Sequence, residues 1–174
     1  GSLSSILRIG IPAGLQAAMY SLSNIIIQTA LNALGTDTVA AWTSFGKMDA
    51  FCWMVISAFG ISATTFVGQN YGAGKYDRVK KSVRVCLGMT LASSIAMSIF
   101  LMTAGKYLFH LFTSDPEVIR IGIQILNYMA PAYALFVFIE IYSGVLRGIG
   151  DVIIPTIMTC CGVCVFRTLW VFLL

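Results

Sequence analysis

Residues 85–112 of the chain read VCLGMTLASSIAMSIFLMTAGKYLFHLF, and this stretch decides the fold class. It is apolar over nearly its whole length and exceeds the roughly 20 apolar residues that cross the hydrocarbon core of a bilayer. A transmembrane β-barrel would instead show short segments in which apolar and polar residues alternate. The stretch therefore predicts a membrane-spanning helix.

Similar stretches occupy most of the remaining chain. The five predicted membrane-spanning helices cover residues 9–34, 39–68, 85–112, 118–146 and 152–174. Only 10% of the residues are charged and 58% are hydrophobic, whereas a soluble domain carries about 25% charged residues. We therefore expect an all-α integral membrane protein with one helical bundle over residues 1–174. The connections leave no room for a catalytic domain or a nucleic-acid-binding module.

The basic residues predict how these helices are oriented. The connection after the second predicted helix holds nearly half of the chain's eleven cations, namely Lys75, Arg78, Lys80, Lys81 and Arg84. Basic residues near the ends of membrane helices favour the cytoplasmic side. We therefore expect a multi-pass protein of the cell membrane, with the N-terminus of this chain in the cytoplasm and Leu174 near the outer face.

Ionisable side chains inside the predicted helices are functional candidates, because they are costly to place in hydrocarbon. Lys47 and Asp49 lie only two residues apart in the second predicted helix, so they do not share a face of it. Each is expected to have a separate partner. The two residues fit an ion or substrate pathway and an internal structural role equally well.

Glu140 is the first candidate for ion coupling. It shares one helical stripe with Tyr133, Gly144 and Arg147 in the fourth predicted helix. A carboxyl group inside the membrane can take up and release a proton, or bind a cation when it is charged. The alternative is a carboxylate that a basic neighbour such as Arg147 neutralises.

The first predicted helix carries a polar side chain at every fourth position. These residues are Gln16, Tyr20, Asn24, Gln28 and Asn32. Amide groups in hydrocarbon need partners, so they either bond to other helices or face a water-filled cavity. The length of the row favours a cavity. Tyr133 is a further candidate for its lining, and Arg167 either lines it or reaches the outer interface.

Other motifs exclude several site classes. The segment with Gly68, Gly72, Gly74 and Lys75 superficially resembles a phosphate-binding loop. Such a loop requires Ser or Thr after the lysine, where this chain has Tyr76, so we expect no nucleotide site. The five cysteines lie inside apolar runs without a second pair of ligands, so we expect no metal and no cofactor. No constellation indicates an enzyme. Gly10-x-x-x-Gly14 and Gly144-x-x-x-Gly148 instead fit close approach between membrane helices.

Five stretches of the sequence form a recognisable combination. They are Gly10-Ile-Pro-Ala-Gly14-Leu-Gln16, Asn32-Ala-Leu-Gly35, Phe66-Val-Gly68-Gln69-Asn70-Tyr-Gly72-Ala-Gly74, Leu111-Phe112-Thr113-x-Asp115-x-Glu117-Val118, and Leu146-Arg147-Gly148-x-Gly150-Asp151 with Pro155. Together they resemble the multidrug and toxic compound extrusion (MATE) transporters over essentially the whole chain. The residues that carry the two most specific motifs are Gly68, Gln69, Asn70, Gly72, Gly74, Arg147 and Gly148.

The resemblance implies a fold and an activity. Such transporters are similar in having twelve helices in two six-helix lobes, and this chain looks like the second, C-terminal lobe without its last helix. The family exports cationic, amphipathic drugs in exchange for inward H⁺ or Na⁺ by alternating access between the lobes. The implied partners are the lipid bilayer, a small organic substrate and the N-terminal lobe of the full-length transporter, with no nucleic acid.

The family pattern also bears on the site residues. Its second lobe often carries an acidic residue in the helix before the Leu-Arg-Gly element, and Glu140 matches that helix about one turn nearer to the element. The carboxylate that some branches carry in the first helix is absent, since Gln16, Asn24 and Gln28 occupy that helix. The resemblance therefore leaves the coupling ion open between H⁺ and Na⁺.

Two other functions compete with this expectation. A flippase for lipid-linked oligosaccharides would need a more cationic central cavity, whereas the cations here gather at the predicted cytoplasmic edge. A non-transporting membrane module that scaffolds partners is the alternative from a different class.

Overall fold

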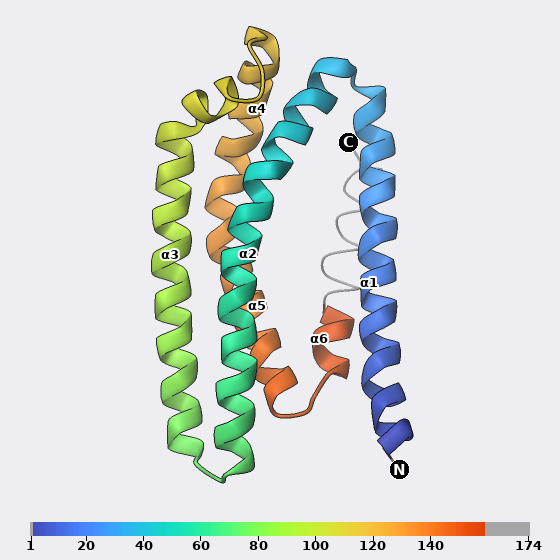
Figure 1. The fold of residues 1–174 in the computed structure, drawn as a ribbon, viewed down its shortest axis with the longest axis vertical. Coiled ribbons are helices and arrows are strands. Elements are labelled where there is room, and N and C mark those ends of the chain that lie inside the picture. The colour runs from blue at the N-terminus through green and yellow to red at the C-terminus, as the bar shows by residue number, and fades with distance from the viewer. Residues whose placement is uncertain (1, 159–174) are drawn as a thin grey trace. The chain divides into compact units, whose positions relative to one another are not determined.

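The structure is a computed structural model that describes residues 2–158, without the side chains of residues 2–9, 12 and 13. This part of the chain is helical and contains no strand. Its elements are α1 (Ser2–Ala33), α2 (Thr36–Gly72), α3 (Tyr76–His110), α4 (Pro116–Met129), the 3-10 helix η1 (Ala130–Ala132), α5 (Tyr133–Gly148) and α6 (Ile153–Met158) (Figure 1). The predicted all-α membrane fold is confirmed.

The fold consists of two compact units. The larger unit covers residues 35–149 and contains α2 to α5. The smaller unit contains α1 and α6, and these two helices contact each other. The first predicted helix, residues 9–34, is present as the unbroken helix α1. The fifth, residues 152–174, begins as α6, and most of its length lies outside the described residues.

Three spans in the larger unit are long and apolar enough to cross a membrane. They are Thr36–Gly72, Tyr76–His110 and Pro116–Gly148. The helices extend beyond the predicted bounds at polar ends; α3, for example, begins at Tyr76 rather than at Val85. The reason is that hydropathy marks only the part of a helix that suits hydrocarbon, whereas Lys and Arg are also good helix formers. The basic connection is therefore mostly helix.

The fourth predicted helix, residues 118–146, is not one continuous α-helix. It is divided into α4 and α5 by η1, which contains Pro131. Proline has no N–H to donate to the preceding turn, and its ring disturbs that turn. From α3, the Ser98 hydroxyl donates a hydrogen bond of 2.8 Å to the Ala130 carbonyl oxygen at this break. At the start of α4, the Asp115 carboxylate caps the helix, accepting a hydrogen bond from the Glu117 N–H at 2.9 Å.

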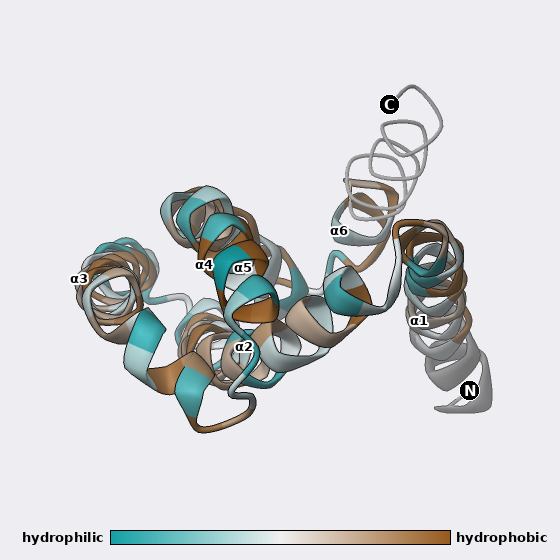
Figure 2. Ribbon diagram, turned by 90° about the horizontal axis from the view of Figure 1, so that it is seen from above, coloured by the Kyte–Doolittle hydropathy of each residue, from teal (hydrophilic) through white to brown (hydrophobic). Residues whose placement is uncertain are grey.

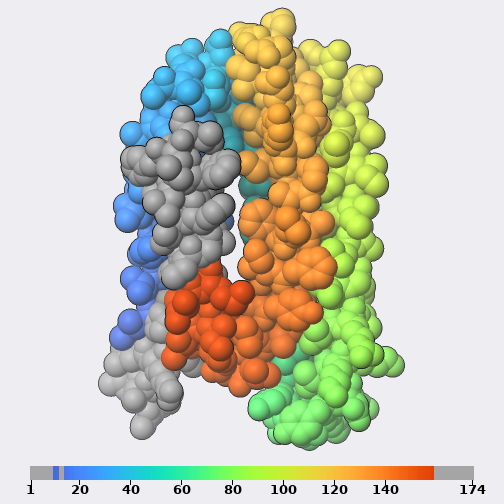
Figure 3. Space-filling view, turned by 180° about the vertical axis from the view of Figure 1, so that it is seen from behind, coloured from blue at the N-terminus to red at the C-terminus, as the bar shows by residue number. Residues whose placement is uncertain are grey.

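Helix α2 is the centre of the larger unit and packs against α3, α4 and α5. Seen from behind, the side chains of α3, α4 and α5 form one continuous surface (Figure 3). The core residues with the least exposed side chains include Cys52, Ile56, Phe109, Leu126, Val137 and Ile141. Large hydrophobic side chains also point outward, for example Tyr107 and Leu135. Figure 2 shows hydrophobic residues on α1 to α5. This distribution suits a protein whose solvent is lipid.

Candidate functional site

Helices α2 and α5 meet along a seam of small residues. A Cβ atom added at Gly144 would lie 2.6 Å from the carbonyl oxygen of Gly60, and one added at Gly148 would lie 2.7 Å from that of Thr64. One added at Gly68 would lie 3.1 Å from the carbonyl oxygen of Gly148. The two backbones therefore touch, and no larger side chain fits between them. The close approach that Gly144-x-x-x-Gly148 predicts is confirmed, and Gly60-x-x-x-Thr64-x-x-x-Gly68 is its partner on α2.

Glu140 lies on the same seam, one turn before Gly144. Its carboxylate occupies the space where a Gly60 side chain would be, since a Cβ atom added at Gly60 would lie 2.7 Å from Glu140 Oε1. The guanidinium Nη2 of Arg147 lies 3.2 Å from the same oxygen, while Nε of Arg147 donates to the Ser143 carbonyl oxygen at 3.2 Å. The exposed fractions are 24% for the Glu140 side chain and 41% for that of Arg147. The neutralising partner that the sequence offered as an alternative is therefore present.

A small polar pocket surrounds this ion pair. Its volume is about 210 Å³, and it is lined by Gly60, Ile61, Thr64, Thr65, Glu140 and Arg147. The hydroxyl groups of Thr64 and Thr65 donate to carbonyl oxygens one turn earlier in α2, those of Gly60 and Ile61. These threonine oxygens keep lone pairs that can accept from water or ligate a cation. The pocket thus combines a carboxylate, a guanidinium and two hydroxyl groups at the edge of the seam.

Sequence reasoning did not single out Gly60, Thr64 and Thr65. A signal for two of them was present, because Gly60-x-x-x-Thr64 is a small-x-x-x-small pattern of the kind that brings membrane helices together. Gly60 has a specific role, since its missing side chain leaves room for the Glu140 carboxylate.

Asp49 and Lys47 have different partners, as their two-residue spacing predicts. An oxygen of the half-buried Asp49 side chain accepts a short hydrogen bond from the Tyr133 hydroxyl. The Lys47 ammonium lies 5.1 Å from the centroid of the Phe112 ring, within the range of a cation–π contact. Tyr133 begins α5 directly after the 3-10 turn, and its exposed fraction is only 3%. The structure thus brings Tyr133 to Asp49 and leaves Glu140 with Arg147.

The polar row lies on α1, in the smaller unit. Gln16 and Tyr20 are partly buried, whereas Asn24, Gln28 and Asn32 are exposed. The Gln28 side-chain amide donates to the side-chain oxygen of Asn32 at 3.2 Å. A cavity shared between this row and residues of α5, which belong to different units, stays a prediction. Arg167 lies outside the described residues.

The family motifs have structural roles at the helix ends. After α2, the Asn70 side chain donates to the Phe66 carbonyl oxygen at 2.7 Å, and the Gln69 carbonyl oxygen accepts from the N–H of Ala73. Gly74 has a φ of 70°, a value that glycine adopts more readily than other residues. Gly150 has a φ of 92° in the second motif. The neighbouring Asp151 carboxylate accepts from the N–H groups of Ile153 and Ile154. Among the described residues, no group of three potential metal ligands comes together.

Comparison with known proteins agrees with this fold. A profile of the MatE family matches residues 12–173. Probable multidrug resistance protein YoeA of Bacillus subtilis is 27% identical over 154 residues, which are 88% of this chain and 33% of that protein. Multidrug and toxin extrusion protein 1 of Homo sapiens is 26% identical over 148 residues, which are 85% of this chain and 26% of that protein.

A solved structure extends the comparison to three dimensions. A MOP superfamily transporter from Pyrococcus furiosus matches with a TM-score of 0.84 and 18% identity, covering 97% of this chain and 41% of that one. The chain thus spans about a third or less of the two relatives and less than half of the archaeal transporter. The relatives bear the names of drug-resistance and extrusion proteins rather than of enzymes. Because the family profile matches almost all of it, the chain belongs to the MatE family of multi-pass membrane transporters.

Proposed function

We propose that the chain forms one transmembrane lobe of an antiporter that exports drugs or other amphipathic organic cations in exchange for H⁺ or Na⁺. The observation that carries this proposal is the Glu140 carboxylate in a polar pocket of about 210 Å³ within the membrane span Pro116–Gly148. Carboxylates inside a membrane span are expensive and mark ion pathways and proton relays. The names of the relatives support drug export as the process that such a site drives.

Glu140 and Arg147 supply a physical basis for coupling. The carboxylate now has the Arg147 guanidinium as its counter-charge at 3.2 Å. A proton or Na⁺ that binds to Glu140 competes with that guanidinium, because either one neutralises the same oxygen atoms. Binding of the ion therefore frees Arg147 from the carboxylate, while the hydrogen bond from its Nε to Ser143 is unaffected. The charge that the pocket presents then differs between the ion-bound and ion-free states.

The seam links this local change to a movement of helices. Since α2 and α5 touch backbone to backbone at Gly60, Gly144 and Gly148, the two helices are expected to move together. Alternating access requires rigid groups of helices that switch between discrete arrangements. A pair of closely packed helices that carries the ion site is suited to be such a group.

Asp49 is a second candidate for coupling. It accepts a hydrogen bond from the Tyr133 hydroxyl, which lies directly after the break at Pro131. Uptake of a proton by Asp49 would change the hydrogen bond that joins α2 to the start of α5. Lys47 is less suited to this role, because its ammonium contacts the Phe112 ring.

The substrate path involves further residues and a partner lobe. We assign the lining of the central cavity to Gln16, Tyr20, Asn24 and Gln28 on α1, together with Arg167. Tyr133, which is almost fully buried against Asp49, is not assigned to this lining. The N-terminal lobe of the full-length transporter supplies the facing half of that cavity. The basic segment from Lys75 to Arg84 lies in the cytoplasm of the cell, at the inner surface of the cell membrane.

Efflux of a cationic dye by the full-length protein tests the proposal. We expect Glu140→Gln to abolish the dependence of efflux on pH or on Na⁺. The glutamine amide takes up no proton and lacks the negative charge that attracts Na⁺. Asp49→Asn is measured in parallel. Glu117→Gln is the matched control, since Glu117 is an acid on the same span whose ion pair with Arg120 is largely exposed. Unchanged ion dependence in Glu140→Gln would remove that residue from the coupling role.

A further inference from the structure

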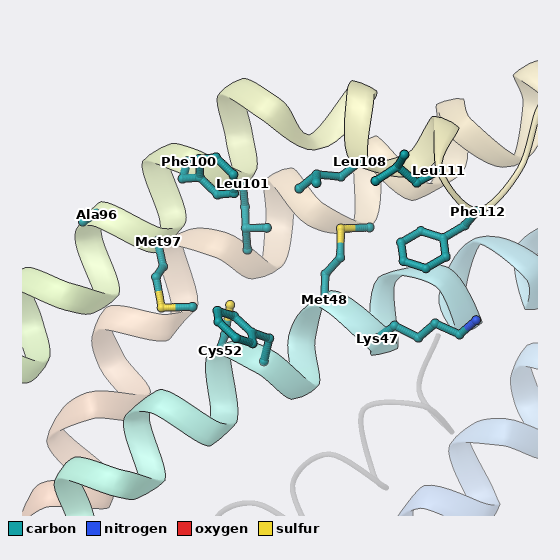
Figure 4. Close-up of a pocket in the computed structure, with 11 residues that line it drawn as sticks. Lys47, Met48, Cys52, Ala96, Met97, Phe100, Leu101, Leu108, Leu111 and Phe112 are labelled. Atoms are coloured by element: carbon teal, nitrogen blue, oxygen red, sulfur yellow. The ribbon is translucent and has the colours of Figure 1, made fainter.

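A second cavity, of a different kind, lies between α2 and α3 in the larger unit (Figure 4). Its volume is about 470 Å³, within the range of sites that hold small molecules. The side chains around it are almost wholly apolar and include Met48, Phe51, Met97 and Phe100. The ion pair of the seam is not part of its lining. We call this cavity the α2–α3 groove.

The groove runs along α3. Its lining residues on that helix extend from Ala96 to Leu108, a rise of about 18 Å at 1.5 Å per residue. One leaflet of a bilayer has a hydrocarbon thickness of about 15 Å, half of the total. The groove is therefore about as long as a single acyl chain in one leaflet. Met48 and Met97 have flexible, unbranched side chains that adapt to such a chain.

One end of the groove carries a positive charge. Lys47 lines it together with Phe112, and the Lys47 ammonium lies 5.1 Å from the centroid of the Phe112 ring (Figure 4). Phe112 lies two residues after the end of α3 at His110. The contact therefore places the ammonium at the level where a membrane helix ends and lipid headgroups begin. Lysine suits this position, because its apolar stem can lie along the groove while its charge reaches the headgroups.

The sides of the groove are open to the lipid. Phe51 and Phe100, which line it from α2 and α3, have exposed fractions of 60% and 58%. Both helices are long and apolar enough to cross the membrane. Lipid molecules diffusing in the bilayer therefore have direct access to the groove, whereas a polar solute would find almost no hydrogen-bonding group in it.

We infer that the α2–α3 groove binds an anionic phospholipid, with one acyl chain along α3 and the phosphate at the Lys47 ammonium. The apolar lining selects the acyl chain, and the charge of Lys47 favours an anionic headgroup over a neutral one and disfavours a cationic ligand. This lipid site is independent of the proposed function, because it shares no lining residue with the seam pocket.

Lipid retention by the full-length protein tests the inference without any measurement of transport. The protein is placed in nanodiscs of phosphatidylglycerol and phosphatidylethanolamine in equal amounts, released, and analysed by native mass spectrometry. We expect Lys47→Gln to lower the retention of phosphatidylglycerol about fivefold, the effect of one lysine near a lipid surface. Lys106→Gln is the matched control, since Lys106 is an exposed lysine of α3 that does not line the groove.

A second substitution tests the groove itself rather than its charge. Ala96 is exposed and lies at the end of the groove opposite Lys47. Ala96→Trp fills that end without a change of charge, and we expect it to lower the retention of phosphatidylglycerol as well. Equal retention in the wild type and Lys47→Gln, or equal losses in Lys47→Gln and Lys106→Gln, would overturn the inference. Equally tight retention of phosphatidylethanolamine, or no effect of Ala96→Trp, would do the same.

Discussion

The two sides of α2 show what side-chain size does to neighbouring membrane helices. From Gly60 to Gly68, small residues let the α5 backbone touch that of α2, and a Cβ atom at Gly144 would lie 2.6 Å from a carbonyl oxygen. Near Met48 and Phe51, large side chains on α2 and α3 leave a groove of about 470 Å³. One helix thus forms a closed seam with one neighbour and an open groove with another.

The chemistry of the two sides differs in the same way. Close approach exposes backbone groups and threonine hydroxyls to Glu140 and Arg147, so the seam can hold a charge. The groove offers almost only hydrocarbon, and its one charge, Lys47, lies at its end. We conclude that the seam suits an ion and that the groove suits an acyl chain.

The largest expected effect breaks the seam. Gly144→Val should markedly destabilise the full-length protein, because its Cβ atom alone would meet the Gly60 carbonyl oxygen at 2.6 Å. Overpacking of a close contact costs about 1–3 kcal/mol or more. Gly88→Val is the matched control, since a Cβ atom at Gly88 meets no atom within 4 Å. Thermal unfolding in detergent measures both, and equal stability of the two variants would contradict a tight seam.

A smaller effect is expected when the ion pair loses one member. Arg147→Gln leaves the Glu140 carboxylate without its guanidinium partner and should destabilise the protein by about 1–2 kcal/mol, less than for a fully buried pair. The double variant Glu140→Gln/Arg147→Gln should recover most of that loss, because it removes the uncompensated charge. Denaturation of the single and double variants measures the interaction free energy between the Glu140 and Arg147 side chains. Additive losses in the double variant would show that the two side chains do not interact.

Helix α2 makes a further polar contact with α5 at Asp49, which lies nearer the N-terminus of α2 than the seam does. Tyr133→Phe removes the hydroxyl that donates to Asp49 and should cost about 1 kcal/mol, the net contribution of one hydrogen bond. Tyr107→Phe is a suitable control, because Tyr107 is 75% exposed. Thermal unfolding compares the two, and an equal, negligible change in both variants would count against a structural role of this bond.

Several features of this comparison could be predicted from the sequence. The long apolar stretches predict the three described spans, because hydrophobic length alone decides whether a helix can cross a bilayer. The spacing of Glu140 and Arg147 predicts that they meet on one helix face, and Gly144-x-x-x-Gly148 predicts a close neighbour. These are properties of single helices, which is why a single sequence contains them.

Features that depend on two helices could not be predicted in this way. The pairing of Gly60 with Gly144, the Tyr133–Asp49 bond and the groove all depend on how α2 is rotated against its neighbours. No spacing within one helix fixes that rotation. Hydropathy does not mark the division of the fourth predicted helix at Pro131, because the apolar stretch continues through it. Pro131 itself indicates a possible bend at this point, but not a full division of the helix.

Ion release on substrate binding tests the central claim most directly. The purified full-length protein is mixed with a cationic dye in weakly buffered solution, and the release of protons or of Na⁺ is recorded. If Glu140 holds the coupling ion, the wild type and Glu117→Gln release it when the dye binds, whereas Glu140→Gln binds dye and releases none. The same release from Glu140→Gln as from the wild type would show that the ion binds elsewhere.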